Sequence, residues 1–233
     1  MSDIPVCNGG EPPAHAVDSA EARQGAIDKV SVPMRTATTL DLMRHGEPVG
    51  GRKYRGQIDD PLSDTGWAQM RAAVGDAAPW TRIVSSPLAR CRAFAETLAA
   101  RHALPLSFDE RLKEVGFGTW EGKTAAEIEQ EAPGTLARFK ADPIHARPTG
   151  AEPLASFYAR VATALDDLLA QHAGQHVLLV GHAGVMRMAL AWALHIPLEH
   201  AYRIEVATAT LTRLRFDGGH ASLIFHGNAR IER

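Results

Sequence analysis

The sequence predicts an α/β fold: a three-layer α/β/α sandwich whose mostly parallel central sheet has an antiparallel edge strand. From Leu40 onward, short apolar segments alternate with longer segments in which apolar residues recur at helical spacing. Residues 177–180 are apolar at every position, as is typical of a parallel strand covered on both faces. Near the C-terminus, two apolar segments flank Asp217-Gly218-Gly219, a hairpin turn signal that predicts the antiparallel strand.

Composition and charge limit the kinds of partner. The 233-residue chain is 45% hydrophobic and 22% charged, as in ordinary globular proteins, and its formal net charge is −2. This charge gives no basic footprint, so nucleic acid is not an expected partner. No apolar run reaches about 18 residues, so neither a membrane span nor a membrane partner is expected. Cys7 and Cys91 are far apart and form no disulfide or metal-binding pattern, which favours a reducing cytoplasm.

We predict a disordered tail over residues 1–37 and one domain over residues 38–233. The tail contains glycines, prolines and scattered acidic residues without apolar periodicity, although residues 18–29 could form a weak helix. It has no apolar region like that of a signal peptide, and its acidic residues argue against an organellar transit peptide. Met34 is an alternative start site.

The first half of the domain is expected to alternate strands and helices. Strands are predicted at 40–43, 80–84 and 104–108, and helices at 67–77 and 88–100. Ser63 or Asp64 is available to cap the first helix. Pro87 is expected near the first turn of the second helix, where its missing N–H is not needed.

The second half begins with an irregular, glycine-containing segment at 109–122. Helices are then predicted at 124–130, 134–141, 153–172 and from about 184 to 194, and strands at 177–180, 207–216 and 220–225. In the longest helix, Leu154, Phe157, Val161 and Leu165 recur at helical spacing, which predicts one side that faces the core.

Polar side chains follow three of the predicted strands. Arg44 and His45 come after the first strand, Arg90 shortly after the second, and His182 after residues 177–180. The carboxyl ends of parallel strands meet at one edge of a sheet, so these side chains are expected to form a cationic cluster there. Arginine matches the geometry of phosphate, so the cluster predicts a phosphate site with His45 as the nucleophile. Each residue taken singly is equally well explained as an ordinary surface or strand-end side chain.

Four motifs occur in order along the chain. They are Arg44-His45-Gly46-Glu47, Ser85-Ser86-Pro87-Leu88-Ala89-Arg90, the segment from Leu112 to Gly122 that contains Glu114, and Val180-Gly181-His182-Ala183-Gly184-Val185. Together they resemble the motifs of the histidine phosphatase superfamily, also called phosphoglycerate mutase-like. The resemblance covers about residues 40–233 and implies the three-layer fold of that family.

The resemblance also implies a phosphohistidine mechanism. His45 would attack phosphorus and form a covalent intermediate. Arg44, Arg90 and a protonated His182 would neutralise the phosphoryl oxygens. Glu114 would protonate the leaving oxygen and then activate water. These positive groups would take the place of a metal ion, so neither a metal nor a cofactor is expected.

Glu114 has rivals as the acid. Glu47, Glu110 and Glu121 are nearby in the sequence, and any of them could be a solvated surface group. The glycine-flanked context of Glu114 and its place in the family motif make it the chosen residue.

The loop after the first motif resembles that of the α-ribazole-5′-phosphate phosphatase branch, which acts in assembly of the cobalamin nucleotide loop. This implies α-ribazole 5′-phosphate as the substrate. Lys53 and Arg55 in this loop, and Ala183 after His182, are expected to contact the substrate together with Arg44, Arg90 and His182. Pro48 and Gly51 stand where many relatives carry Thr or Ser and Asn, so the contact from that Asn is absent.

Other functions stay open. The chain could be a broad-specificity small-molecule or sugar phosphatase. A phosphoglycerate mutase is less favoured, because the chain lacks the longer helical insertion of those enzymes. A sensor or scaffold that binds a phosphorylated ligand without turnover would not need both His45 and Glu114. The expected partner is a small-molecule phosphomonoester, and a homodimer is one assembly that the sequence leaves open.

Overall fold

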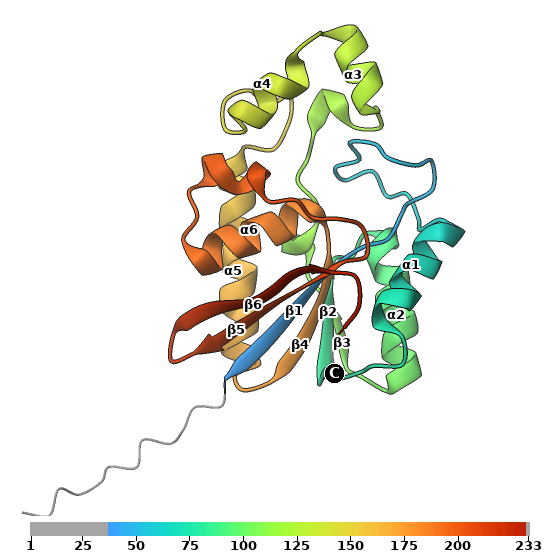
Figure 1. Ribbon diagram of the computed structural model, residues 1–233, viewed down its shortest axis with the longest axis vertical. Coiled ribbons are helices and arrows are strands. Elements are labelled where there is room, and N and C mark those ends of the chain that lie inside the picture. The colour runs from blue at the N-terminus through green and yellow to red at the C-terminus, as the bar shows by residue number, and fades with distance from the viewer. Residues whose placement is uncertain (1–36, 232–233) are drawn as a thin grey trace, which may run out of the picture. The chain divides into compact units, whose positions relative to one another are not determined.

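A six-stranded sheet in the order β3-β2-β4-β1-β5-β6 forms the centre of the protein (Figure 1). The structure, a computed structural model, describes residues 37–231. The strands are β1 (Thr38–Arg44), β2 (Arg82–Ser85), β3 (Leu106–Phe108), β4 (His176–Gly181), β5 (Leu211–Asp217) and β6 (His220–Asn228). The predicted tail, its weak helix and Met34 lie outside the described residues, apart from residue 37.

The sheet is parallel on one side and antiparallel on the other. Strand β4 pairs in parallel with both β1 and β2, and β2 pairs in parallel with β3. Strand β5 runs antiparallel to β1, and β6 runs antiparallel to β5. Gly218 and Gly219 connect β5 to β6 with φ values of 57° and 90°, a conformation that favours glycine at both turn positions. The predicted sheet, with its hairpin, is confirmed.

Helices cover both faces of the sheet (Figure 1). The buried side chains of β1 alternate between two cores: Leu40 and Leu42 pack on the side of α5 (Leu154–Gln171) and α6 (Ala183–Leu194). Met43 packs on the opposite side, against α1 (Asp64–Val74) and α2 (Ala89–His102). The alternation follows from the two-residue repeat of a strand, and it confirms the three-layer α/β/α fold.

Two predictions about helix starts have different outcomes. Ser63 caps α1, because its hydroxyl accepts a hydrogen bond of 3.0 Å from the Gly66 N–H, so the helix begins before the predicted residue 67. Pro87 lies near the first turn of α2, as predicted, but it is not part of the helix. Helix α2 begins at Ala89 with Leu88 as its N-cap, so Pro87 precedes the helix altogether.

Several short elements lie near the carboxyl ends of the parallel strands and were not predicted as helices. They are the 3₁₀ helices η1 (Glu110–Leu112), η2 (Gly118–Trp120) and η3 (Leu198–Arg203). The predicted strand at 207–216 begins only at residue 211, since Ala209 has a positive φ of 54° and interrupts the extended chain. Helices α3 (Ala125–Glu131) and α4 (Thr135–Ala141) lie beyond the carboxyl ends of β1, β2 and β4 (Figure 1).

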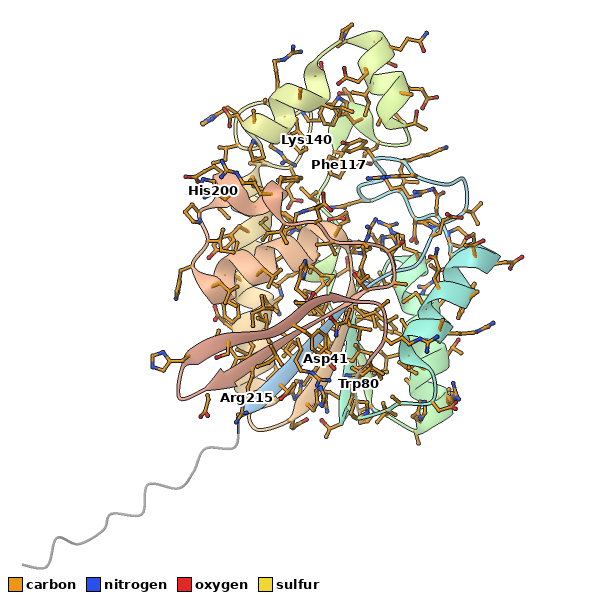
Figure 2. The ribbon with its side chains drawn as sticks, viewed as in Figure 1. Asp41, Trp80, Phe117, Lys140, His200 and Arg215 are labelled. Carbon is orange, nitrogen blue, oxygen red and sulfur yellow. The ribbon has the colours of Figure 1, made fainter. Side chains whose placement is uncertain are left out.

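A buried carboxylate ties the middle of the sheet together. Asp41 on β1 is 0% exposed and accepts hydrogen bonds from Trp80 Nε1 at 2.8 Å and from Arg213 Nε at 2.7 Å; its Oδ2 also lies 2.9 Å from His176 Nε2 (Figure 2). Burial raises the pKa of Asp41, but the hydrogen bonds from Arg213, His176 and Trp80 outweigh burial and hold the pKa below its ordinary value of 3.8.

We expect Asp41→Asn to lower the free energy of unfolding at pH 7 by about 2–3 kcal/mol, because the partners of this carboxylate lose its negative charge and one of its two acceptor oxygens. Urea denaturation measures this effect. The contribution of Asp41 is complete above pH 3.8 and is lost as the pH falls through the lowered pKa of the folded state, so the difference between the two proteins should shrink below pH 3.8. Asp217→Asn, which removes an exposed ion pair with Arg215, is the matched control and should change stability by about 0.5 kcal/mol or less. An equal effect of both substitutions would contradict the prediction.

Candidate active site

The predicted cluster forms at the carboxyl edge of the parallel strands. In the sheet register, Arg44 at the end of β1 lies opposite Gly181 at the end of β4, and Ser85 at the end of β2 lies opposite Val180. The next residues along β1 and β4 are His45 and His182, and their rings lie with centroids 5.2 Å apart. We refer to Arg44, His45, Arg90 and His182 as the cationic cluster.

His45 is held as a neutral ring with one free nitrogen. The side chain is only 6% exposed, and its Nδ1 lies 2.7 Å from the Gly46 carbonyl oxygen, which can only accept a hydrogen bond. Nδ1 therefore carries the proton, and Nε2 keeps its lone pair. Burial, together with the positive charges of Arg90 and Arg44, holds the pKa of His45 well below 6.5. An unprotonated Nε2 is the form of histidine that acts as a nucleophile.

His182 is fully buried at the N-cap position of α6. Its Nε2 lies 2.7 Å from the Ser86 hydroxyl oxygen, and that oxygen accepts a hydrogen bond from the Leu88 N–H. Burial, and then the positive charges of Arg90 and Arg44, hold the pKa of His182 well below 6.5. A protonated His182 in the phosphate-bound protein stays a prediction. A bound phosphate dianion would act in the opposite direction and favour the protonated ring.

The two arginines of the cluster are anchored through one end of the guanidinium group. Arg44 Nη1 donates to the Val206 carbonyl at 2.5 Å, and Arg90 donates through Nη1 and Nη2 to the carbonyls of Ile58 and Gly56, at 2.7 and 2.9 Å. The Nε atoms of both arginines are buried without a hydrogen-bond partner among the described residues. Burial lowers the pKa of Arg44 from 12.5 to about 10, and Arg90 and other nearby cations add to the lowering. A bound anion would accept hydrogen bonds from the unpaired Nε atoms and would stabilise the positive charge of Arg44.

Glu114 is joined to the start of α6. Its carboxylate accepts a hydrogen bond from the Val115 N–H at 2.9 Å and another from the Gly184 N–H at 3.2 Å. The absence of a side chain at Gly184 permits this contact, because a Cβ there would lie 2.1 Å from Glu114 Oε1 and 3.1 Å from the Phe157 ring. The charge of Glu114 also stabilises the protonated form of Arg44, so the carboxylate lies within electrostatic reach of the cluster.

The three rival acids have other contacts. Glu47 Oε1 accepts from the Ser63 hydroxyl at 3.3 Å, and Glu121 Oε1 accepts from the Phe117 N–H at 2.9 Å. Glu110 is exposed and pairs with Lys113 at 2.6 Å. These contacts stabilise loops or lie on the surface. Among the four acids, Glu114 is therefore the one that contacts the start of α6, next to His182.

Arg55, Lys53 and Ala183, which are expected to contact the substrate, differ in burial and in their contacts. Arg55 is 6% exposed and binds Asp60 at 2.8 Å and the Val49 carbonyl at 2.6 Å, and its charge contributes to the lowered pKa of His45. Lys53 is exposed, and Ala183 is the first residue of α6. Substrate contact by these three residues stays a prediction.

The sequence interpretation missed a second group of polar side chains near the cluster. Arg187 lies on α6, donates from Nε to the Ile204 carbonyl at 2.9 Å, and contributes to the lowered pKa of Arg44. A signal for this residue was present, since Arg187 is the one charged residue of α6. No comparable signal marks Arg147 and Tyr202, which come from different segments and meet only in the fold.

Residues 37–231 contain neither a metal-binding cluster nor a helix that could span a membrane. No group of three or more His, Cys, Asp or Glu side chains in this part of the chain could hold a metal ion. No helix in the same range is long and apolar enough to cross a membrane.

Comparison with curated proteins gives relatives along most of the chain. The bifunctional protein Rv2228c of Mycobacterium tuberculosis is 34% identical over 194 residues, which cover 81% of this chain and 53% of that protein. The chain thus spans about half the length of the first curated relatives that it matches. A glucosyl-3-phosphoglycerate phosphatase of Mycobacterium tuberculosis is 34% identical over 178 residues, or 70% of this chain and 78% of that protein.

Solved structures share the fold. The Bacillus stearothermophilus protein YhfR has a TM-score of 0.74 and 31% identity, with 82% of this chain and 97% of that chain covered. The α-ribazole phosphatase from Shigella flexneri has a TM-score of 0.71 and 27% identity, with 84% of this chain and 98% of that chain covered. Residues 40–229 match the sequence model of the histidine phosphatase superfamily, branch 1. The chain therefore belongs to the histidine phosphatase superfamily, the family that its four motifs resemble.

Proposed function

We propose that the protein is a metal-independent phosphomonoesterase that acts through a phosphohistidine on His45. The observation that carries the proposal is the state of His45. Its Nδ1 is bound to the Gly46 carbonyl at 2.7 Å, and its Nε2 is left with a lone pair beside Arg44, Arg90 and His182. A nucleophile surrounded by groups that neutralise phosphoryl oxygens fits phosphoryl transfer.

In the first step, the lone pair of His45 Nε2 attacks phosphorus in line with the ester oxygen, and the phosphorus–oxygen bond breaks. Arg44, Arg90 and His182 hold the phosphoryl oxygens as their charge redistributes. Glu114 enters this step protonated, with a proton taken up from solvent as the phosphate dianion binds, and the ester oxygen leaves as an alcohol after taking that proton. The products of this step are the free alcohol, phosphohistidine and the Glu114 carboxylate.

In the second step, a water molecule takes the place of the alcohol. The Glu114 carboxylate takes a proton from this water, whose oxygen attacks phosphorus as the bond to His45 Nε2 breaks. Inorganic phosphate leaves, and His45 and Glu114 return to their starting protonation states. The hydrogen bonds from Val115 and Gly184 keep the Glu114 carboxylate in one place during both steps.

Hydrolysis of p-nitrophenyl phosphate tests the proposal. The folded protein should release p-nitrophenol at the same rate with and without EDTA, because the cationic cluster rather than a metal ion neutralises the phosphoryl group. Absence of turnover by folded protein, or turnover abolished by the chelator, would defeat the proposal. Binding of phosphate without turnover would instead favour a sensor or scaffold.

The substrate is a small-molecule phosphomonoester in this proposal, with two candidate classes. The first is α-ribazole 5′-phosphate, which would place the enzyme in cobalamin nucleotide-loop assembly in the cytoplasm. The resemblance of the loop that holds Lys53 and Arg55, and the structural similarity to the α-ribazole phosphatase from Shigella flexneri, support it. Family and fold do not by themselves determine the substrate in such enzymes.

The second candidate class is a phosphorylated carboxylic acid. The relative named glucosyl-3-phosphoglycerate phosphatase supports this class, and so does the presence of Arg187 close to Arg44. The ratio of kcat/KM for α-ribazole 5′-phosphate to that for 3-phosphoglycerate separates the two classes. A homodimer stays part of the proposal, and size-exclusion chromatography with light scattering measures it.

A further inference from the structure

Arg187 lies in a part of α6 that is otherwise apolar, and its guanidinium group is fixed at one end only. Its Nε donates to the Ile204 carbonyl at 2.9 Å, and its guanidinium carbon lies 5.2 Å from the centroid of the Tyr202 ring. These two contacts come from η3 and from the loop that follows it. Within residues 37–231 the two terminal nitrogens of Arg187 make no hydrogen bond, so they can serve as a fork for an anion.

The same loop also binds Arg44, which lies at the end of β1. Arg44 Nη1 donates to the Val206 carbonyl, two residues after the carbonyl that holds Arg187. An extended chain advances about 3.3 Å per residue, so the two carbonyls lie no more than about 7 Å apart. Arg187 is therefore a near neighbour of the cationic cluster, on the side of Arg44. The contribution of Arg187 to the lowered pKa of Arg44 agrees with this placement.

Two more polar groups in this region lack partners. Nε and Nη2 of Arg147 and the hydroxyl of Tyr202 are buried without a hydrogen bond of good geometry among residues 37–231. Both side chains pack against Phe139: the Tyr202 ring lies with its centroid 4.8 Å from that of Phe139, and the Arg147 guanidinium carbon lies 5.8 Å from it. Buried donors without acceptors are rare in proteins and often mark the place of a ligand.

Charge in this region is positive. Within residues 37–231, Arg187 donates to the Ile204 carbonyl, and Arg147 contacts the Pro143 carbonyl and the Tyr202 hydroxyl, so neither arginine has a carboxylate partner there. Burial raises the pKa of Tyr202, against the lowering effects of Arg147 and Arg187, so its hydroxyl is a neutral donor at pH 7. The N–H groups that these contacts leave on the two arginines, and the hydroxyl proton of Tyr202, are therefore donors suited to the same kind of ligand.

We propose that Arg187, Arg147 and Tyr202 form a second anion subsite beside the cationic cluster, and that this subsite binds a carboxylate on the alcohol part of the substrate. The inference rests on the proposed phosphatase function and names the substrate class: phosphorylated hydroxy acids and amino acids. A carboxylate presents two oxygens in a plane, which suits the planar fork of arginine and leaves lone pairs for the Tyr202 hydroxyl. α-Ribazole 5′-phosphate has no carboxylate and would leave the subsite unfilled.

Binding to a protein that does not turn over is the test. In a His45→Ala background, isothermal titration calorimetry compares 3-phosphoglycerate with glycerol 3-phosphate, which has a hydroxymethyl group in place of the carboxylate. We expect 3-phosphoglycerate to bind about 10- to 100-fold more tightly, because its carboxylate would form charge-assisted hydrogen bonds with the buried arginines. Arg187→Met and Arg147→Met should each reduce this ratio about tenfold or more, and Tyr202→Phe, which keeps the ring contacts, should reduce it a few-fold.

Arg203→Met is the matched control, because Arg203 is the exposed neighbour of Tyr202 on η3. It should leave the ratio unchanged. Equal affinity for the two ligands, or a ratio that survives all three substitutions in the folded proteins, would overturn the inference. Should Arg187→Met fail to fold, Arg147→Met, Tyr202→Phe and the ratio in the parent protein still decide the result. Turnover of either ester by the protein with His45 intact reports on the phosphatase proposal separately, and binding of neither ligand would overturn both.

Discussion

Replacing His45 by alanine is expected to lower kcat/KM for p-nitrophenyl phosphate by about 10⁴-fold or more, because no other described side chain offers an activated nitrogen to phosphorus. His45 is buried, and its backbone N–H donates to the Gly181 carbonyl at 2.9 Å, a contact that alanine keeps. The fold should therefore survive, which circular dichroism and thermal melting can verify. His220→Ala, at the exposed end of the β5–β6 hairpin, is the control and should retain full activity.

A covalent label identifies the nucleophile directly. After rapid mixing with substrate and quenching, the protein with His45 should carry acid-labile, base-stable phosphate, and the His45→Ala protein should carry none. Since the pKa of His45 lies well below 6.5, protonation of this ring should not slow label formation between pH 8 and pH 6.5. Accumulation of the same label on His45→Ala protein would show that another histidine is the nucleophile.

Much of the fold could be predicted from periodicity alone. The continuous apolar run of β4 and the helical spacing in α5 are strong patterns, because burial on both faces or on one side demands them. The errors lie where local patterns compete with tertiary contacts. Helix α2 was predicted from about Leu88, yet Leu88 is its N-cap and the helix begins at Ala89. The apolar residues before Leu211 resemble a strand, yet the chain there turns at Ala209 and supplies the carbonyl of Val206 to Arg44.

The candidate site divides in the same way. Arg44, His45 and His182 could be predicted to meet because they follow adjacent parallel strands, and the sheet register determines where strand ends lie. Arg147 and Tyr202 could not, because they come from a loop and a 3₁₀ helix with no periodic signal. Their closeness depends on how both segments pack around Phe139. Residues that select a substrate often lie on loops, because loops vary in sequence while the helices and strands that support them are retained.

Glu114→Gln should separate the two steps of the reaction. In an alkyl phosphate such as glycerol 3-phosphate, the leaving group is a poorly stabilised alkoxide. Loss of the acid should therefore reduce kcat/KM for this ester about 10²- to 10⁴-fold. p-Nitrophenolate leaves without a proton, so phosphorylation of His45 by that ester should slow by about tenfold at most. Glutamine keeps the size of the side chain and one acceptor for the N–H groups of Val115 and Gly184, so a large effect would reflect proton transfer rather than a collapsed site.

The second step still needs a base, and glutamine cannot accept the proton of water. Rapid mixing of Glu114→Gln protein with p-nitrophenyl phosphate should therefore give a burst of p-nitrophenol about equal to the protein concentration, followed by slow turnover. Glu110→Gln, which changes an exposed acid paired with Lys113, should give the same steady rate as the unaltered protein. Equal losses for both esters without a burst would mean that Glu114 positions the site instead of moving protons, and one of the rival acids would then be the proton donor. A burst seen only with Glu114→Gln, together with the loss of activity on the alkyl ester, would assign both the protonation of the alcohol and the deprotonation of water to Glu114. The absence of a side chain at Gly184 allows this carboxylate to contact the start of α6.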